Sequence, residues 1–434
     1  MTRATTISLT FRTRWLGILL TLGLWPVAGA SAITTQDKLL RLARAGDVAP
    51  LQARYEEISD PAARALAQLE VEAAHGRASG TRSAMARYLK LGDLDVDRAA
   101  RAWSLVTGVA FSEGRFRDSA EAAAHWNALL AKSDPQHEAA DAAQAQSLAT
   151  LLASAPSLTV LNGRARRIVM TRDKAGLLRS DIDLNGMPQS AVFDTGANVC
   201  VVSASAAAKL HLRVLSGYST VGSSSRRSVP VKLGIGDRMK IAGYVFKNVP
   251  FIILDDRQLQ ISLSGGYQME TIIGYPIFRA MGAITFGHGY FEPTHSSPSR
   301  APDNLTVQGG DLFVRMAIAG HDTALHLDTG AATSELSTVF VQENPSILTG
   351  LKQSSERIGS AGGATTHMIA HYADAPITIA KRSITLPDLA IESTGSLDVT
   401  DTTLGTLGQD ILSRFSSYTI DLKAMRFSVE APQG

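Results

Sequence analysis

Two aspartates, Asp194 and Asp328, each begin an Asp-Thr-Gly-Ala run that directly follows a largely apolar stretch. A carboxyl group can donate or accept a proton, and two of them brought together can divide the roles of acid and base between them. The two runs therefore indicate a single chemical site, provided that the fold brings their ends together.

Each aspartate belongs to a longer repeat. A glycine precedes each by eight residues, and a second glycine, which closes an apolar-apolar-Gly or similar triplet, follows each by 80 residues. These markers are Gly186 and Gly274 in the first copy and Gly320 and Gly408 in the second. The alternative is a pair of ordinary β-turns in a duplicated domain, because Asp and Gly are common turn residues. Turns need not repeat their long-range spacing, so the repeat favours a functional pair.

An Asp-Thr-Gly after an apolar strand, then a glycine-rich stretch, then apolar-apolar-Gly resembles the aspartic peptidases. Alanine at positions 197 and 331 is similar to the retroviral branch, whereas pepsin-like enzymes usually carry serine or threonine there. Retroviral enzymes are homodimers with one aspartate per chain. This chain holds both halves in tandem, like the pepsin-like enzymes, and the resemblance covers residues 165–434.

The resemblance implies that Asp194 and Asp328 form a catalytic dyad that hydrolyses peptide bonds. Two carboxyl groups about 3 Å apart cannot both ionise, so they share one proton. The ionised member takes a proton from a water molecule, while the protonated member polarises the scissile carbonyl and stabilises the oxyanion. The pair titrates as a unit, so neither aspartate has one permanent role.

The same resemblance implies roles for the residues beside the dyad. Thr195 and Thr329 would hydrogen-bond across to the opposite loop and lock the two loops together. Gly196 and Gly330 would let the two backbones approach closely, because glycine has no Cβ atom.

Flaps and supporting strands are also implied by the resemblance. The strands before Gly274 and Gly408 would pass under the catalytic loops. An extended peptide can add as a strand between flap and floor. Pepsin-like flaps usually carry a tyrosine, which residues 222–225 lack. The flap residues expected to contact substrate are Gly222, Ser223, Gly359 and Ser360.

Our leading prediction is an exported aspartic endopeptidase that acts on peptides or proteins and needs no cofactor and no metal. One alternative is a duplicated peptidase fold that binds peptides without cutting them. In another, the N-terminal helical domain is a partner-binding scaffold and the peptidase fold is its passenger.

Residues 1–32 are typical of a secretory signal peptide. Three arginines and no acidic residue precede an apolar run over residues 15–24, and a small-x-small cleavage site follows at 30–32. The apolar run is about half of the ~20 residues needed to span a bilayer, which favours cleavage over an uncleaved anchor. We therefore expect a periplasmic or secreted protein with no membrane span after cleavage.

Residues 33–156 are rich in Ala, Leu, Arg and Glu, which favour helices, and apolar residues recur at helical spacing. The stretch 111–120 resembles half of a tetratricopeptide repeat, but no clean period of ~34 residues emerges, so an ordinary helical domain is an equal alternative. This domain could recruit a protein partner or shield the cleft as a pro-segment. Breaks between its helical hairpins are predicted at Gly46-Asp47, Asp60-Pro61, Gly92-Asp93, Gly114 and Asp134-Pro135.

After residue 156 the sequence turns rich in β-branched residues, Gly and Ser, which favours strands. The predicted fold class is multidomain α+β, with the helical-hairpin domain followed by an all-β bilobal acid-protease fold. Lobe 1 is expected at 160–290 and lobe 2 at 303–434. Three prolines between His288 and Pro302 predict a linker at 291–302.

Composition excludes several function classes. The 434 residues include 42 Lys+Arg and 40 Asp+Glu, a formal net charge of +2, which gives no basic excess for nucleic acid. The single cysteine, Cys200, excludes an intrachain disulfide and any multi-cysteine metal site, and we expect it to be a core thiol. His367 and His371 lie four apart in strand-like sequence, where a metal pair is not favoured.

Overall fold

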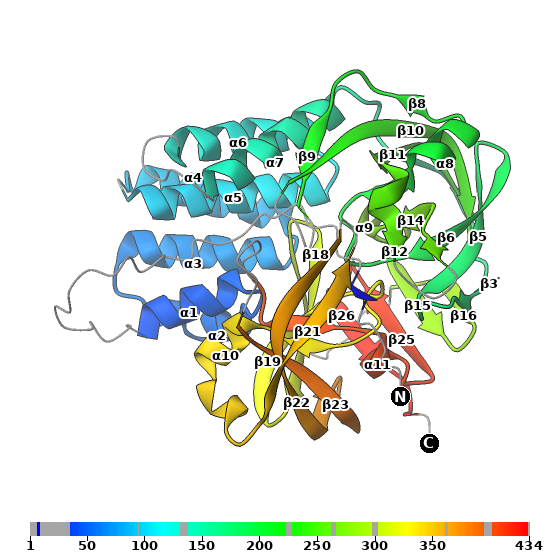
Figure 1. The fold of residues 1–434 in the computed structure, drawn as a ribbon. Helices are drawn as coiled ribbons and strands as arrows, with labels where there is room; N and C mark the ends of the chain where they lie inside the picture. The colour runs from blue at the N-terminus through cyan, green and yellow to red at the C-terminus, as the bar shows by residue number, and fades with distance from the viewer. Residues whose placement is uncertain are drawn as a thin grey trace.

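The computed structural model describes residues 7–8, 35–93, 95–130, 138–222, 228–261, 266–296, 303–360, 363–394 and 402–432. The predicted order is confirmed at the level of classes, because helices come first and a β-rich region follows (Figure 1). The predicted signal peptide lies outside the described residues apart from β1 (Ile7–Ser8), which pairs with β21 (Gln353–Ser360). In the described part of the chain, no helix is long and apolar enough to cross a membrane.

The N-terminal region folds into consecutive helices, with α5 packed on α6 and α6 on α7. The predicted breaks at Gly46-Asp47, Asp60-Pro61, Gly92-Asp93 and Gly114 lie at boundaries between helices, and the one at Asp134-Pro135 lies outside the described residues. A further break, which was not predicted, separates α3 from α4. There Gly76 has a φ of +62°, a backbone conformation that glycine adopts easily. The elements are α1 (Thr35–Arg44), α2 (Ala49–Arg54), η1 (Tyr55–Glu57), α3 (Pro61–Ala74), α4 (Ala78–Lys90), α5 (Val96–Ser112), α6 (Phe116–Leu130) and α7 (Glu138–Ala153).

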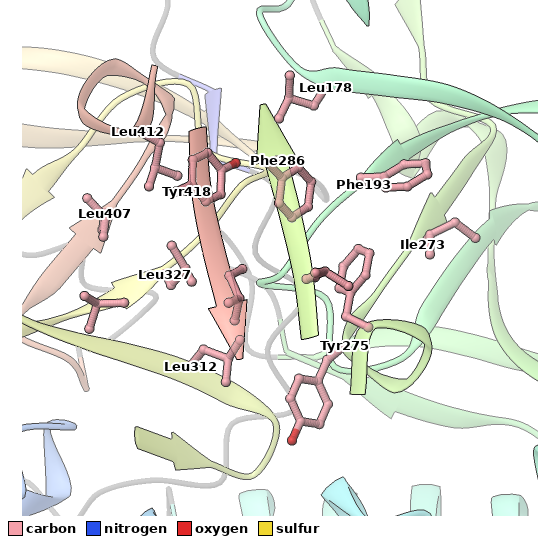
Figure 2. Packing of buried hydrophobic residues seen from close by; sticks show 14 of the residues in the cluster. Leu178, Phe193, Ile273, Tyr275, Phe286, Leu312, Leu327, Leu407, Leu412 and Tyr418 are labelled. Atoms are coloured by element: carbon pink, nitrogen blue, oxygen red, sulfur yellow. The ribbon is translucent and has the colours of Figure 1, made fainter. Parts of the chain in front are cut away.

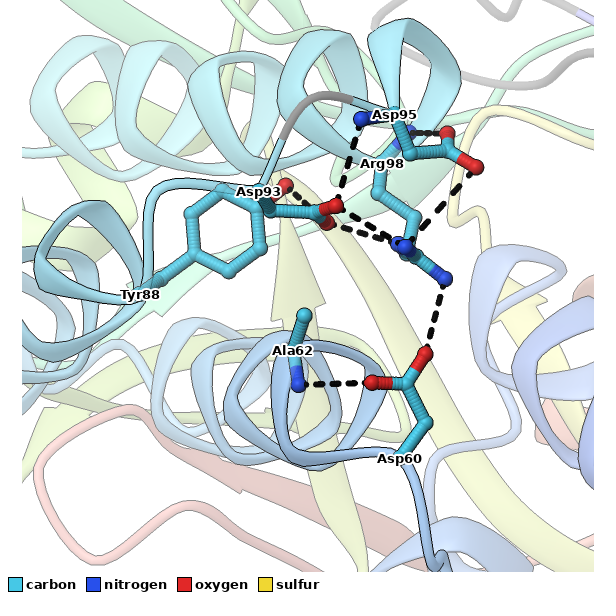
Figure 3. A network of polar contacts seen from close by, with 6 residues as sticks. All are labelled: Asp60, Ala62, Tyr88, Asp93, Asp95 and Arg98. Carbon is cyan, nitrogen blue, oxygen red and sulfur yellow. Dashed lines mark hydrogen bonds and ion pairs between the residues drawn. The ribbon is translucent and has the colours of Figure 1, made fainter.

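Polar contacts join the starts of α3 and α5 (Figure 3). Asp60 caps α3 by accepting a hydrogen bond of 2.9 Å from the Ala62 amide, and its other oxygen contacts Arg98 Nη1 at 3.0 Å. Arg98 also binds both oxygens of Asp93, at 2.7 and 2.8 Å, and lowers the pKa of Asp93 to about 2. These contacts fix the stacking of one helical pair on the next.

The first half of the β-rich region runs from residue 159 to residue 294 and carries the sheet order β2-β11-β7-β14-β6-β5-β10-β8. β4 also pairs with β5, β9 pairs with β10, and the short β12 (Gln260–Ile261) and β13 (Tyr267–Gln268) pair with each other. The strands of the main sheet are β2 (Thr159–Gly163), β4 (Thr171–Arg172), β5 (Leu178–Leu184), β6 (Met187–Phe193), β7 (Cys200–Ser203), β8 (Arg213–Val214), β9 (Ser219–Val221), β10 (Val229–Ile241), β11 (Tyr244–Leu254) and β14 (Thr271–Ile273).

The second half, residues 303–432, supplies every strand except β1 to a sheet with the order β1-β21-β22-β23-β20-β24-β19-β18-β17. Local pairing repeats that of the first half. β6 is parallel to β14, which is antiparallel to β7, and β19 is parallel to β24, which is antiparallel to β20. The remaining strands are β17 (Leu305–Gln308), β18 (Asp311–Ile318), β19 (His321–Leu327), β20 (Glu335–Leu336), β22 (Gly363–Ile379), β23 (Arg382–Thr394) and β24 (Gly405–Leu407).

A five-stranded sheet with the order β26-β25-β15-β16-β3 joins the two halves. At its centre, β15 (Ala283–Gly287) pairs with β25 (Ser417–Asp421), and the rings of Phe286 and Tyr418 stack with centroids 5.1 Å apart. The outer strands are β3 (Ile168–Val169), β16 (Tyr290–Thr294) and β26 (Arg426–Val429). Buried residues of both halves surround the stacked rings, among them Phe193, Ile273, Leu327 and Leu407 (Figure 2).

One boundary of the predicted architecture is wrong. The linker predicted at 291–302 begins too early, because residues 291–294 belong to β16, where Phe291 and Pro293 are buried. β16 pairs with β3 only at Tyr290 and Phe291, so Pro293 lies beyond that pairing, where its missing amide proton is tolerated. Between its strands the β-rich region also contains the short helices α8 (Ala204–Lys209), α9 (Tyr275–Met281), α10 (Thr338–Glu343) and α11 (Gln409–Leu412), and the turns η2 (Asp256–Leu259) and η3 (Pro345–Leu348).

A buried ion pair holds α3 against α5. Arg101 contacts both carboxylate oxygens of Glu70, at 2.6 and 2.7 Å, and both residues are at most 4% exposed. Removing one partner of such a pair leaves the other charge buried without compensation.

We predict that Arg101→Met lowers the free energy of unfolding by about 3–5 kcal/mol, because the Glu70 carboxylate loses its counter-ion. Urea unfolding of the full-length protein measures this change. The double variant Arg101→Met/Glu70→Gln should recover most of the loss, since no buried charge then remains. A single variant as stable as the wild type would contradict the prediction.

Candidate active site

Each aspartate stands at the end of a buried strand. The Asp194 amide, after β6, donates a hydrogen bond of 3.0 Å to the carbonyl of Ile273 in β14. In the same way the Asp328 amide, after β19, donates to the carbonyl of Leu407 in β24 at 3.1 Å. The apolar strands before and 80 residues after each aspartate therefore pair with each other and fix where its backbone lies.

Thr195 and Thr329 connect the two loops through four buried hydrogen bonds. The Thr195 hydroxyl donates to the Leu327 carbonyl at 2.7 Å and accepts from the Thr329 amide at 3.0 Å. The Thr329 hydroxyl donates to the Phe193 carbonyl at 2.8 Å and accepts from the Thr195 amide at 3.0 Å. Each hydroxyl thus uses its proton and a lone pair on the opposite half.

The glycine of each loop lies against the aspartate of the other. A Cβ atom built on Gly330 would be 2.5 Å from Asp194 Cγ, and one on Gly196 would be 2.9 Å from Asp328 Cγ. Within each loop the glycine amide donates to its own aspartate's Oδ1 at 2.8 Å. A larger residue at either position would push the carboxyl group of the opposite loop out of its place.

Both carboxyl groups are fully buried, with 0% exposure of Asp194 and Asp328. Burial raises the pKa of Asp194 well above its ordinary range, and the neighbouring Asp328 carboxyl raises it further. A buried carboxyl pair of this kind is set up to keep one proton and to exchange it with a bound group.

Gly274 and Gly408 lie directly behind the loops. A Cβ atom would be 2.3 Å from the Ala197 carbonyl oxygen at Gly274 and 2.6 Å from the Thr333 carbonyl oxygen at Gly408. The next residue in each copy donates its amide to the carbonyl of the alanine in the loop, at 2.8 and 2.9 Å. Only glycine therefore fits behind each loop.

Sequence reasoning missed one further matched pair. The Gly274 amide donates to Cys200 Sγ at 3.4 Å, and the Gly408 amide donates to Ser334 Oγ at 2.8 Å. Both acceptors stand six residues after their aspartate, so the repeated offset could have found them. Burial raises the pKa of the Cys200 thiol to about 12, which agrees with a core thiol and not with a nucleophile.

The two halves differ in the residues that follow these glycines. In the second half Asp410 accepts from the Ser334 amide and hydroxyl, at 2.9 and 2.6 Å, and Gln409 Nε2 donates to the Thr329 carbonyl at 2.9 Å. In the first half the corresponding residue is Tyr275, which is 4% exposed. Side-chain polar contacts support the loop of the second half, whereas in the first half the Tyr275 side chain lies beside Glu113 and Arg279.

The predicted flap residues lie on two hairpins. Gly222 follows β9, which pairs with β10, while Ser223 lies outside the described residues. Gly359 and Ser360 end β21, where they pair with the first residues of β22. Contact of these flap residues with substrate stays a prediction.

Histidines brace the second hairpin. His371 of β22 contacts Glu356 of β21 through Nε2 at 3.0 Å and Asp388 of β23 through Nδ1 at 2.8 Å. Partial burial works against the charged ring, but the two carboxylates outweigh it and raise the pKa of His371. His367 likewise pairs with Glu392. In the described residues, no group of three or more His, Cys, Asp or Glu side chains could hold a metal ion.

Comparison with known proteins finds a family model that matches part of the chain. Residues 180–277, which include Asp194 and Gly274 but not Asp328, match the family model described as aspartyl protease. The chain is also similar to the crystal structure of a retropepsin-like aspartic protease from Rickettsia conorii, at 15% identity and a TM-score of 0.21, over 31% of this chain and 92% of that chain. No match was found to a curated protein.

We predict that Thr195→Val lowers the free energy of unfolding by about 2–4 kcal/mol, because the Leu327 carbonyl and the Thr329 amide lose their buried partner. Thermal or urea unfolding measures the loss. Thr195→Ser keeps the hydroxyl and should stay close to the wild type. If valine and serine have equal effects, the crossed hydrogen bonds do not hold the loops.

The His371 contacts predict a pH-dependent contribution to stability. Because the folded pKa is raised, this contribution is full below about pH 6.5, the ordinary histidine value, and is lost as the pH rises through the raised pKa. The measurement is the difference in unfolding free energy between the wild type and His371→Gln, from below pH 6.5 to above the raised pKa. A difference that does not change with pH would refute the charged contact.

Proposed function

We propose that this protein is an exported aspartic endopeptidase that hydrolyses peptide bonds with water activated between Asp194 and Asp328. One observation carries the proposal: two fully buried carboxyl groups lie on loops that are crossed by four threonine hydrogen bonds. The aspartyl protease match over residues 180–277 supports the same chemistry. We further propose that the two halves form a bilobal acid-protease fold and that the helical hairpins stack as in tetratricopeptide proteins.

The chemistry follows from the shared proton. With one carboxyl ionised and one protonated, the ionised group removes a proton from water as that water attacks the scissile carbonyl carbon. The protonated group donates a hydrogen bond to the carbonyl oxygen, where negative charge develops. Return of a proton to the leaving nitrogen then breaks the C–N bond and restores the pair.

The hairpins on both halves suit an extended peptide as substrate. Such a peptide would lie as a strand between the dyad and the ends of the β9–β10 and β21–β22 hairpins, held by backbone hydrogen bonds. Backbone recognition selects for an extended chain more than for one side chain, so we propose peptides or unfolded protein segments as the substrate class.

We also propose export to the periplasm or the medium. The basic start, the short apolar run and the small-x-small site of residues 1–32 support it. Amino-terminal sequencing of the protein recovered outside the cytoplasm would test it, with Ile33 expected as the first residue.

We predict that Asp194→Asn and Asp328→Asn each lower kcat for peptide cleavage at least about 10³-fold, because neither variant can hold one proton between two carboxyls. Mass spectrometry of a mixed peptide library measures cleavage. Asp181→Asn, at an exposed position of β5, is the matched control and should cut normally. Cleavage by all variants would exclude the dyad, and binding of uncut peptides by the wild type would favour the non-catalytic alternative.

The raised pKa of Asp194 also predicts the form of the pH profile. Activity should fall at low pH, where both carboxyls are protonated, and at high pH, where both are ionised. Because the pKa of Asp194 is raised, the high-pH loss should come well above pH 3.9, the ordinary aspartate value. A profile that collapses near pH 4 would contradict this assignment.

A further inference from the structure

We propose that the helical region, residues 35–153, is a built-in lid that closes the substrate cleft, so that the intact chain is a latent peptidase. This inference rests on the proposed function and adds a regulatory role for the helices. Of the two roles predicted for the helical domain, its contacts favour shielding over recruitment. We call residues 35–153 the helical lid.

The helical lid shares a hydrophobic core with one face of the sheet that carries Asp194. Along β6, β7, β11 and β14 alternate residues point to opposite faces. One set packs into the core that continues to the second half: Phe193, Cys200, Val202, Phe251, Ile253 and Ile273. The other set belongs to one cluster with buried residues of α5, α6 and α7: Val192, Val201, Ile252, Leu254 and Ile272 from the sheet, with Phe111, Trp126, Leu130, Leu148 and Leu152 from the helices.

Helix α7 is attached to the strand that leads into the first flap. Gln144 Nε2 donates to Thr220 Oγ1 at 3.0 Å, and the Ser219 hydroxyl donates to the Ser147 hydroxyl at 3.1 Å. Ser219 and Thr220 lie in β9, just before Gly222, and Figure 1 shows α7 running beside this strand. Val221, Val229 and Val231 of the same hairpin are in the cluster shared with the helices. The first flap therefore cannot move outward without moving α7 or breaking these contacts.

The other end of the helical lid is fixed to the second half. The Gln308 side chain donates to the Ala43 carbonyl at 2.6 Å, Arg315 lies 3.7 Å from Asp47, and Arg41 forms an ion pair with Glu343 of α10. In the middle, a Cβ atom on Gly108 of α5 would be 3.2 Å from the backbone of Gly309, in the turn between β17 and β18. The helical lid thus bridges both halves that supply the dyad.

In this arrangement the dyad is shielded from solvent. Both carboxyls have 0% exposure, and the loop residues 191–200 are all buried. A cavity of about 350 Å³ marks a looser part of the boundary, between the α5–α6 turn and Asn198, Val199 and α9. At this boundary Arg279 of α9 contacts Glu113 at 3.5 Å, and Glu113 also binds Arg115 at 2.7 Å.

The degree of latency depends on the fraction of molecules in which the helical lid is displaced. If only a small fraction of molecules has the helical lid displaced, the apparent affinity for substrate is the intrinsic affinity multiplied by that fraction. Any change that weakens the boundary without touching the dyad should raise activity. Two positions allow such a change: Gln144, which is buried against β9, and Glu113, which lies between two arginines.

The test compares Gln144→Arg and Glu113→Arg with Glu121→Arg, which makes the same Glu-to-Arg change at an exposed position of α6. Two readouts are used on full-length mature protein: kcat/KM for a short peptide cut by the library assay, and the Kd of a statine-containing peptide by calorimetry. We expect both boundary variants to raise kcat/KM and tighten binding at least about tenfold, with Glu121→Arg equal to the wild type.

A second route leaves the boundary residues unchanged. A recognition sequence for a site-specific protease, placed between Ala155 and Pro156 and cut after folding, makes the helical lid a separate molecule. Binding of the cut helical lid to the β-rich region is then bimolecular. Dilution should therefore release the helical lid and raise the activity per molecule. This arm decides the question if an arginine variant fails to fold.

The outcomes separate the two proposals. Equal inhibitor binding and equal kcat/KM in the wild type, both boundary variants and the cut protein would overturn the lid while the peptidase assignment stands. Absence of both cleavage and inhibitor binding in every form, including the cut protein on dilution, would overturn the proposed function and the lid with it.

Discussion

The crossed hydrogen bonds of Thr195 and Thr329 are the contact on which the rest of the site depends. Each hydroxyl satisfies one amide and one carbonyl of the opposite half in a buried place, where an unpaired polar group would be costly. Because they fix both loops, the glycines can lie against the opposite carboxyls, and the carboxyls can be buried next to each other. Burial and proximity then raise the pKa of Asp194.

Sequence reasoning reaches this centre because the relevant information is local and repeated. The Asp-Thr-Gly tripeptides identify Asp194 and Asp328. Gly274 and Gly408 are identified because each follows its aspartate by 80 residues. Strand boundaries are harder to predict, as residues 291–294 show. Pro293 favours a linker, yet β16 accommodates it at a position where the backbone needs no amide donor to the neighbouring strand. The contact of α7 with β9 has no local signature, because it joins a serine and a glutamine to a strand about 75 residues away.

The helical region is integrated with the β-rich region through packing and not only through a tether. Its aromatic and aliphatic residues complete a core that the first half does not close alone, and buried polar contacts hold it to the second half. Such a boundary combines an apolar interior with a few specific hydrogen bonds, the combination that gives two domains one preferred arrangement. The geometry of the flap strand β9 is therefore set partly from outside its own half.

The unequal supports behind the two loops have a consequence for ligand symmetry. Tyr275 stands behind one loop, while Gln409 and Asp410 stand behind the other, and a thiol in the first half matches a hydroxyl in the second. Because both halves belong to one chain, each could change its residues without changing the other. The two carboxyls therefore have chemically different surroundings behind their loops, so the two ends of a two-fold symmetric molecule bound across the centre would not be equivalent.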